Sequence, residues 1–435
     1  MAKTNRDDFP PSFKQAHAAR ASHKCSFARC NHPTSGPSEL NDRHSWRVFL
    51  IFLKLGLTSF GGPVAHLGYF RDEFVIRRRW LSEHNYADLV ALCQFLPGPA
   101  SSQVGIALGL TRAGYAGALA AWAGFTLPSA VALIVFARGI AAYGNIVASG
   151  TLHGLKIAAV AVVVQAVWGM ARSLCQGVIR VTIMMAAACL ALSVPSSSGQ
   201  VSAIVFAGIL GLLLFKPTQT VAHEPLPITV SRRVGGLWLL LFFTLLAGLP
   251  VLAHEMPGQT VVMVDVFYRV GSLVFGGGHV VLPLLQAEVV PSGWVSNDVF
   301  LAGYGATQAV PGPLFTFSAF LGASMASSPT GWLGGIVALL AIFTPSFLLI
   351  AGALPFWETL RHNLRMQAAL AGVNAAVVGL LLAALYSPVW TSAIQKPQDF
   401  GLALIALTAL VFWKMPPWIV VVGCGFAGWL MRLIL

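Results

Sequence analysis

Two short stretches of this sequence carry the same polar and helix-breaking residues at the same spacing. They are Gln94, Pro97, Gly98 and Pro99 in the first stretch and Gln308, Pro311, Gly312 and Pro313 in the second. Proline inside a helix removes an N–H donor and clashes with the preceding turn, so each triplet should end one helix and allow another to begin. The first N–H groups of a new helix have no backbone partners and carry the positive end of its dipole, which suits an anion.

Hydroxyl groups lie beside both predicted helix starts, at Ser101, Ser102 and Thr316. The two stretches therefore predict an oxyanion cradle built from two broken helices. The alternative is a pair of structural kinks whose hydroxyls bond to their own helices.

Glycine-rich motifs precede both stretches. Their residues are Phe60, Gly61, Gly62 and Pro63 in the first copy and Phe275, Gly276, Gly277 and Gly278 in the second. Glycine allows a sharp bend or the close approach of another backbone. A histidine follows each motif, His66 and His279, although not at matching positions. Such a histidine could bind or pass protons near neutral pH, or it could be a hydrogen-bonded structural residue.

Charged residues inside or beside apolar stretches are the next candidates, because charge is expensive in a membrane. They are Lys54, Glu73, Arg112, Lys156 and Arg269. Lys54 and Arg269 stand at matching positions, so we expect them to supply cations to the site, and an arginine can grip two oxygens of a dianion at once. Long basic side chains near helix ends often reach only to the membrane interface, and this topological role is favoured for residues 77–79.

The ordered matches indicate an internal duplication of about half the chain. Gly62 and Glu73 have the same spacing as Gly277 and Glu288. The remaining matches are Trp80 with Trp294, Lys54-x-Gly56 with Arg269-x-Gly271, Pro128-Ser129 with Pro345-Ser346, and Gly154-x-Lys156 with Gly372-x-Asn374.

The composition is that of an integral membrane protein. Of the 435 residues, 56% are hydrophobic and only 10% are charged, whereas soluble proteins carry about 25% charged residues. The net charge of +12 is explained by cytoplasmic loops that obey the positive-inside rule rather than by nucleic-acid binding. The six cysteines are scattered and form no disulfide framework. No P-loop, dinucleotide fingerprint or nucleophile elbow is present, so we expect neither an enzyme nor a cofactor.

We predict an all-α fold with thirteen apolar segments. They lie near 46–67, 87–110, 113–137, 144–170, 178–194, 199–215, 234–254, 262–283, 297–325, 331–355, 367–389, 399–413 and 416–435. If all of them cross, seven precede the second copy, and this odd number inverts it, as in many secondary transporters. The tail and the basic residues after the first segment are both expected on the cytoplasmic side, although one crossing segment would separate them. This indicates that the segment near residues 60–63 enters the membrane and returns on the same side.

The expected organisation has four parts. Residues 1–45 form a disordered basic cytoplasmic tail, 46–215 the first repeat, 216–260 a linker with one additional span, and 261–435 the second repeat. The tail contains the spacing His23-x-Cys25-x4-Cys30-x-His32, which is either four metal ligands or an incidental cluster, and we expect no metal site.

With these motifs aligned in both halves, the chain resembles the chromate ion transporter family in its long, two-domain bacterial form. The resemblance covers residues from about 45 to the end and rests on the repeated Phe-Gly-Gly, Glu, Trp, Gln and Pro-Gly-Pro positions. It implies export of chromate across the bacterial inner membrane and chromate resistance, with sulfate as a structural analogue. The copies differ where Pro63 becomes Gly278 and Lys156 becomes Asn374.

The sequence therefore predicts a secondary transporter that exports chromate, driven by the membrane potential, a proton gradient or both, with His66 or Glu73 as proton carriers. A dianion leaving a cell that is negative inside gains about 2.3 kcal/mol per charge for each 100 mV. The alternatives are a sulfate or related oxyanion importer, a membrane-bound chromate reductase, and a scaffold or sensor that uses the tail. The oligomeric state stays open, with a homodimer as one candidate.

Overall fold

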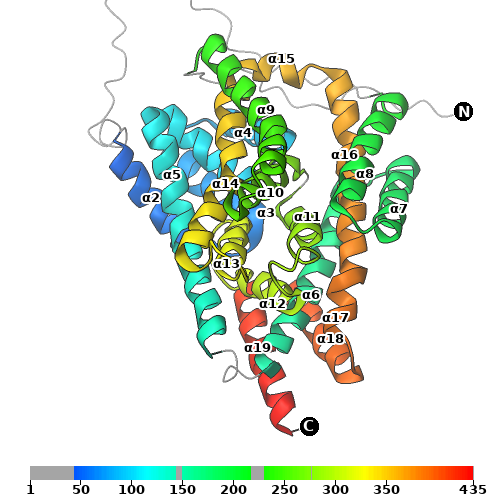
Figure 1. Cartoon of the computed structure of the whole chain (residues 1–435). Coiled ribbons are helices and arrows are strands. Elements are labelled where there is room, and N and C mark those ends of the chain that lie inside the picture. Colours follow the sequence, from blue (N-terminus) through cyan, green and yellow to red (C-terminus); the bar gives the residue numbers. More distant parts are fainter. Residues whose placement is uncertain (1–43, 144–148, 217–229, 276, 435) are drawn as a thin grey trace, which may run out of the picture. The chain divides into compact units, whose positions relative to one another are not determined.

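The computed structural model describes residues 44–143, 149–216, 230–275 and 277–434. Within these ranges every regular element is helical, as the composition predicts (Figure 1). The tail with its histidines and cysteines, most of the hydrophilic stretch between the repeats, and Gly276 lie outside the described residues.

In its described residues, the first repeat contains seven α-helices and one π-helical turn. These are α2 (Ser45–Thr58), α3 (Gly62–Arg71), η1 (Asp72–Arg77), α4 (Glu83–Phe95), α5 (Ala100–Tyr143), α6 (Ser149–Leu174), α7 (Val178–Ser193) and α8 (Ser197–Leu214). Both helix breaks expected here are present, since α2 ends before the Phe-Gly-Gly motif and α4 ends before Pro-Gly-Pro.

The second repeat has the same order of elements, preceded by the additional helix α9 (Arg232–Glu255). Its elements are α10 (Gln259–Leu273), η2 (Gly278–Val280), α11 (Val281–Val289), α12 (Asn297–Thr307), η3 (Leu314–Thr316), α13 (Phe317–Ala323), α14 (Gly331–Ala353), η4 (Leu354–Phe356), α15 (Trp357–Arg361), α16 (Leu364–Ala384), η5 (Leu385–Trp390), α17 (Thr391–Ala393), α18 (Pro397–Val411) and α19 (Pro417–Ile434).

Helix α5 is a tight hairpin rather than one straight rod. Its backbone leaves the helical region at Ala113 and at Gly114, where φ is 63°. The two halves pack so closely that a Cβ on Gly109 would collide with the carbonyl oxygen of Gly117. Helices α13 and α14 form the equivalent hairpin in the second repeat.

Each repeat packs its last hairpin against the other repeat. Helix α6 of the first repeat packs on α18 and α19, and α16 of the second packs on α7 and α8. Glycine permits both contacts, because a Cβ on Gly154 would collide with the carbonyl oxygen of Cys424, and one on Gly372 with that of Ala207. The two repeats therefore interlock through matching glycines.

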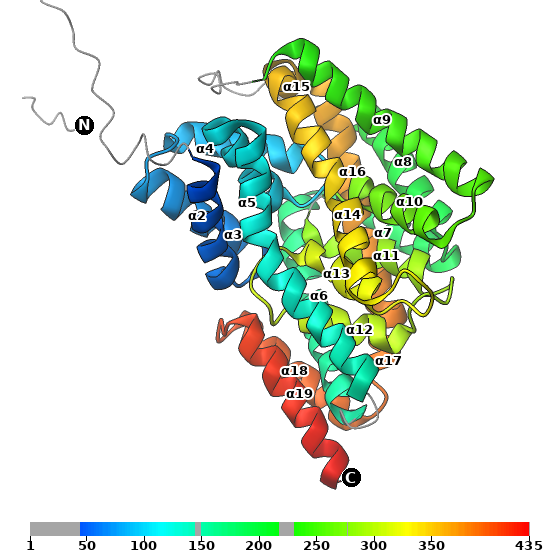
Figure 2. The same ribbon diagram turned by 60° about the vertical axis from the view of Figure 1, so that its left-hand side comes forward.

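Two pairs of equivalent helices, α5 with α14 and α6 with α16, run in opposite directions (Figures 1 and 2). In Figures 1 and 2 the second half of α5 descends toward the end where α17 and α18 lie, whereas α14 rises from α13 toward α15. In the same way α6 ascends and α16 descends in Figure 1.

Six helical stretches in the described part of the chain are long and apolar enough to cross a membrane: 100–142, 150–174, 197–214, 232–255, 331–361 and 364–393. Shorter apolar helices occupy 178–193, 314–323, 397–411 and 417–433. The protein is thus a multi-pass membrane protein by length and hydropathy of its helices. The count of thirteen crossings stays a prediction.

Candidate functional site

The two Pro-Gly-Pro breaks contact the opposite repeat in the same way. The N–H of Gly98 donates to the carbonyl of Val274 at 2.7 Å, and the N–H of Gly312 donates to the carbonyl of Ser59 at 3.0 Å. Ser59 and Val274 directly precede the two Phe-Gly-Gly motifs. All four motifs singled out in the sequence therefore meet where the repeats face each other.

Only glycine fits at the centre of each break. Gly98 has φ of 123° and Gly312 has φ of 108°, a region that side chains disfavour. A Cβ on Gly98 would lie 2.9 Å from the Ser346 hydroxyl oxygen, and one on Gly312 would lie 2.8 Å from that of Ser129. The Pro-Ser pairs of α5 and α14 thus pack against the break of the other repeat.

A cavity of about 590 Å³ lies beside the first break. Amide side chains reach it from three helices, namely Gln94 on α4, Gln165 on α6 and Asn374 on α16. The other lining residues are Gly61, Pro63, Val64, Leu67, Cys93, Leu96, Gly98, Ala100, Ala166, Gly169, Met170, Ser173, Leu174, Gly277, Gly278 and His279. Both repeats contribute to this cavity, as the cradle hypothesis requires.

A much smaller cavity, of about 20 Å³, lies beside the second break. Its lining residues are Gly61, Gly62, His279, Thr307, Gln308, Val310, Gly312, Leu314 and Pro417. His279 lines both cavities, and its Nδ1 lies 2.7 Å from the Tyr304 hydroxyl.

The first break presents a helix N-terminus to the larger cavity, because α5 begins at the lining residue Ala100. The Gln103 side chain donates to the Pro97 carbonyl at 2.7 Å and fixes the break. The buried Ser102 hydroxyl has no hydrogen-bond partner in the structure, and that of Ser101 lies 3.4 Å from His66 Nδ1.

The second break differs in its hydroxyl groups. Thr316 donates to the Pro313 carbonyl at 2.7 Å, so this hydroxyl is bonded to its own turn, which is the alternative that the sequence left open. His66 is buried, with Nε2 3.2 Å from the Ser59 carbonyl, and it is not among the residues that line either cavity.

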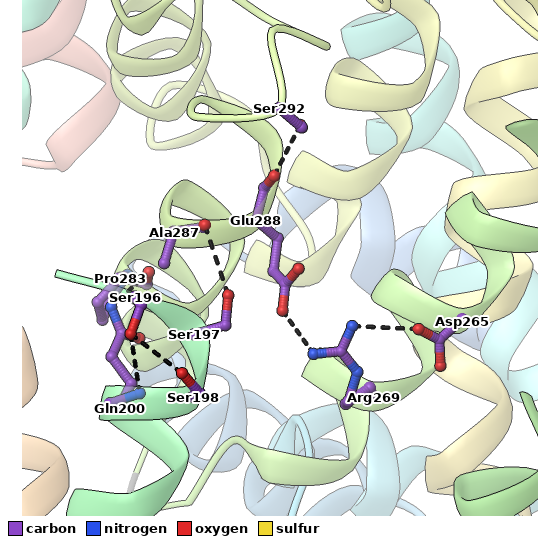
Figure 3. Close-up of polar contacts among 11 residues, drawn as sticks. Ser196, Ser197, Ser198, Gln200, Asp265, Arg269, Pro283, Ala287, Glu288 and Ser292 are labelled. Carbon is purple, nitrogen blue, oxygen red and sulfur yellow. Dashed lines mark hydrogen bonds and ion pairs between the residues drawn. The ribbon is translucent and has the colours of Figure 1, made fainter. Parts of the chain in front are cut away.

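The charged candidates lie away from the larger cavity, whose described lining contains no lysine, arginine or carboxylate. Lys54 is exposed on α2. Arg269 is held between Asp265 at 3.1 Å and Glu288 at 2.6 Å, as Figure 3 shows. Lys156 pairs with Asp298 at 2.9 Å.

The equivalent glutamate of the first repeat is also paired. Glu73 contacts Arg77 at 3.2 Å and Arg78 at 2.6 Å. The guanidinium of Arg112 lies over the Trp80 ring, 5.2 Å from its centroid. These contacts indicate that the buried charged side chains hold neighbouring elements together. The structure does not bring Lys54 and Arg269 together to bind one anion.

The aromatic residues of the motifs also pack. The Phe60 ring lies 6.1 Å from that of Trp418 on α19. Phe275 and Trp294 are partly buried against the largest apolar core cluster. The sequence interpretation missed Gln165, although an amide within the apolar run of α6 was a signal, and it noted Asn374 only as the counterpart of Lys156.

Comparison with known proteins agrees with this architecture. The family described as Chromate transporter matches residues 46–212 and again 261–429, one match for each repeat. The chain belongs to the chromate transporter family. The resemblance inferred from the repeated motifs is therefore confirmed.

Relatives within the chromate transporter family match almost the whole chain. A probable chromate transport protein of Synechococcus elongatus is 28% identical over 386 residues, covering 87% of this chain and 93% of its own. The chromate transport protein of Pseudomonas aeruginosa is 28% identical over 401 residues, 88% and 92% of the two chains. That of Cupriavidus metallidurans is 24% identical over 393 residues, 88% and 92%. No solved structure matches this chain.

Proposed function

We propose that this protein is a secondary transporter that exports chromate from the cytoplasm across the bacterial inner membrane and thereby confers chromate resistance. The observation that carries the proposal is the cavity of about 590 Å³ to which both repeats of a chromate transporter family member contribute polar groups.

Chromate would be bound in this cavity by neutral donors. The amides of Gln94, Gln165 and Asn374 and the N-terminus of α5 at Ala100 face the same space. Helix N-termini and amide N–H groups bind tetrahedral oxyanions without a paired cation. Arg269 and Lys156 then act by holding helices in place, since each already has a carboxylate partner.

The two repeats would be inverted with respect to the membrane and would rock about the crossing Pro-Gly-Pro breaks. The opposite directions of α5 and α14 support this arrangement (Figure 2). Irregular backbone survives at membrane depth only where it is buried in protein or lines a wet cavity, which fits both breaks.

Export of a dianion needs no nucleotide. Each charge that leaves a cell held at 100 mV, negative inside, gains about 2.3 kcal/mol, so the two charges of chromate gain about 4.6 kcal/mol. A proton gradient can add to this drive. His279 is better placed than His66 or Glu73 as a proton carrier, because it lines both cavities whereas Glu73 is paired with two arginines.

The test is uptake of chromate into inside-out membrane vesicles, with sulfate as competitor. We compare the wild type with Gln94→Leu and with the matched surface change Gln176→Leu, after measuring the amount of each protein in the membrane. One hydrogen bond to a charged group contributes about 1.5–3 kcal/mol, so Gln94→Leu should lower uptake by roughly 10- to 100-fold.

Gln176 is exposed beyond the end of α6, and its replacement should leave uptake unchanged. If wild-type vesicles take up sulfate but not chromate, the protein is a sulfate transporter with the same site. If Gln94→Leu transports chromate at the wild-type rate, the larger cavity is not the binding site.

A further inference from the structure

The two cavities are lined by equivalent residues of the two repeats. Counting from the matched Pro-Gly-Pro triplets, the equivalent pairs are Cys93 and Thr307, Gln94 and Gln308, Leu96 and Val310, Gly98 and Gly312, and Ala100 and Leu314. One cavity nevertheless measures about 590 Å³ and the other about 20 Å³. A difference of this size between equivalent places needs a structural cause.

One difference between the two places is how closely α12 packs on α6. Gly305, three residues before Gln308, sits so close to α6 that a Cβ there would collide with the carbonyl oxygen of Leu155. The equivalent residue on α4 is Ala91, three residues before Gln94, and it is exposed. Helix α12 is therefore pressed onto α6, whereas α4 and α16 form walls of the larger cavity.

An ion pair also stabilises the contact between α12 and α6. Lys156, next to Leu155 on α6, lies 2.9 Å from Asp298 in the first turn of α12. In the opposite repeats, the counterpart of Lys156 is Asn374 on α16 and the counterpart of Asp298 is His84 on α4, and these two cannot form a lysine–carboxylate pair. Instead Asn374 faces the larger cavity, and its buried Oδ1 has no hydrogen-bond partner in the structure.

The smaller cavity keeps polar groups of the kind that the larger one presents. Gln308 lines it, and the buried Nε2 of this side chain has no hydrogen-bond partner in the structure. A donor without a partner in a buried place is costly, which indicates a group that is used in another state. His279 lies at the boundary, since it lines both cavities.

We propose that the cavity beside Gln308 is a second binding site for the same tetrahedral oxyanion, closed here by α12. It opens when α12 separates from α6 at Gly305 and the Lys156–Asp298 pair breaks, while α4 closes onto α16. The two sites thus face opposite sides of the membrane in turn. This inference rests on the proposed transport function.

The experiment measures access to each cavity with single cysteines. Gln94→Cys and Gln308→Cys are placed separately in full-length protein whose native cysteines are replaced by serine or alanine. A membrane-impermeant maleimide is added to right-side-out or inside-out vesicles. The cysteine at 94 should react from one side and that at 308 from the other. A minor conformation is populated at about 0.1–10%, so position 308 should react roughly 10- to 1,000-fold more slowly.

Two further substitutions test whether the contact between α12 and α6 keeps the smaller cavity closed. Gly305→Ala should raise the reaction rate at position 308 by about tenfold or more, because the closed contact has no room for a Cβ. Asp298→Asn, at a side chain that is 73% exposed, should act in the same direction without damage to the core. The control is Gly401→Ala on α18, where a Cβ would meet nothing within 4 Å, and it should leave the rate unchanged.

The inference is overturned if positions 94 and 308 react from the same side, or if neither Gly305→Ala nor Asp298→Asn accelerates the reaction at 308. This outcome is independent of the substrate. Vesicles that transport chromate but fail the two-sided labelling refute the second site alone, whereas two-sided labelling without chromate uptake refutes the proposed substrate alone.

Discussion

Arg269 provides a direct test of whether the buried charges bind the substrate or hold the fold. Its guanidinium joins Asp265, one turn earlier on α10, to Glu288 near the end of α11 (Figure 3). The side chains of Asp265 and Glu288 are only 8% and 15% exposed. We predict that Arg269→Gln destabilises the protein, because it leaves two carboxylates with little solvent and no cation.

The magnitude follows from this burial. Removing one partner of a buried ion pair costs about 3–5 kcal/mol. Arg269 is itself 28% exposed, so water screens part of the interaction and the lower end, about 3 kcal/mol, is expected. Replacing all three residues, as Arg269→Gln, Asp265→Asn and Glu288→Gln, should recover most of the loss, since no charge is then left without a partner.

The assay is thermal denaturation of the purified protein in detergent, combined with chromate uptake into inside-out vesicles. Arg365→Gln, at an exposed arginine in the first turn of α16, is the control for loss of one positive charge. The reasoning is refuted if Arg269→Gln is as stable as the wild type but inactive and the triple variant stays inactive. That pattern would place Arg269 in the path of the anion.

Three further predictions concern the interface between the repeats and the residue shared by the cavities. Gly154→Val should lower the melting temperature, because its side chain would collide with the backbone of α19 and overpacking costs about 1–3 kcal/mol; Gly236→Val on α9, where a Cβ meets nothing within 4 Å, should not. Arg361→Ala should lower the free energy of unfolding by about 3–5 kcal/mol, because it removes the cation that lies 3.2 Å from Asp88, a side chain only 8% exposed. The double variant Arg361→Ala/Asp88→Ala should lose less, since no buried carboxylate is then left without this cation. Equal losses of the two variants in thermal denaturation would contradict this. His279→Gln should weaken the dependence of chromate uptake on an imposed pH gradient, since His279 lines both cavities and contacts the Tyr304 hydroxyl. An unchanged dependence on the gradient would remove His279 from proton coupling.

Local sequence patterns were sufficient to predict the helical class of the protein and the places where two of its helices break. Pro97 and Pro311 each belong to a Pro-Gly-Pro triplet, whose two prolines remove backbone donors and clash with the preceding turn, so the breaks after α4 and α12 could be predicted from residue types. A single proline, such as Pro250 in α9, does not end its helix. The duplication and the all-α class could also be predicted, because both are recorded in the order and hydropathy of neighbouring residues.

Partners that are distant in the sequence could not be predicted in this way. Lys54 and Arg269 occupy matching positions, yet one is exposed on α2 and the other is held by Asp265 and Glu288. Lys156 has its partner 142 residues away on α12. The spacing of residues records what lies on one helix, but it does not record which helix packs beside it.

The sequence by itself thus determined that this chain is a duplicated helical membrane protein with two broken-helix motifs. Only the tertiary structure decided that the repeats exchange their last hairpins, that the buried cations are already neutralised, and that one of two equivalent cavities is large while the other is nearly closed. The physical reason is that close packing depends on the contact of whole helix faces. Gly305 carries a hydrogen atom where the equivalent Ala91 carries a methyl group, and this difference permits α12 to pack closely on α6. Neither the hydropathy of the segment nor the spacing of the motifs reveals such a contact.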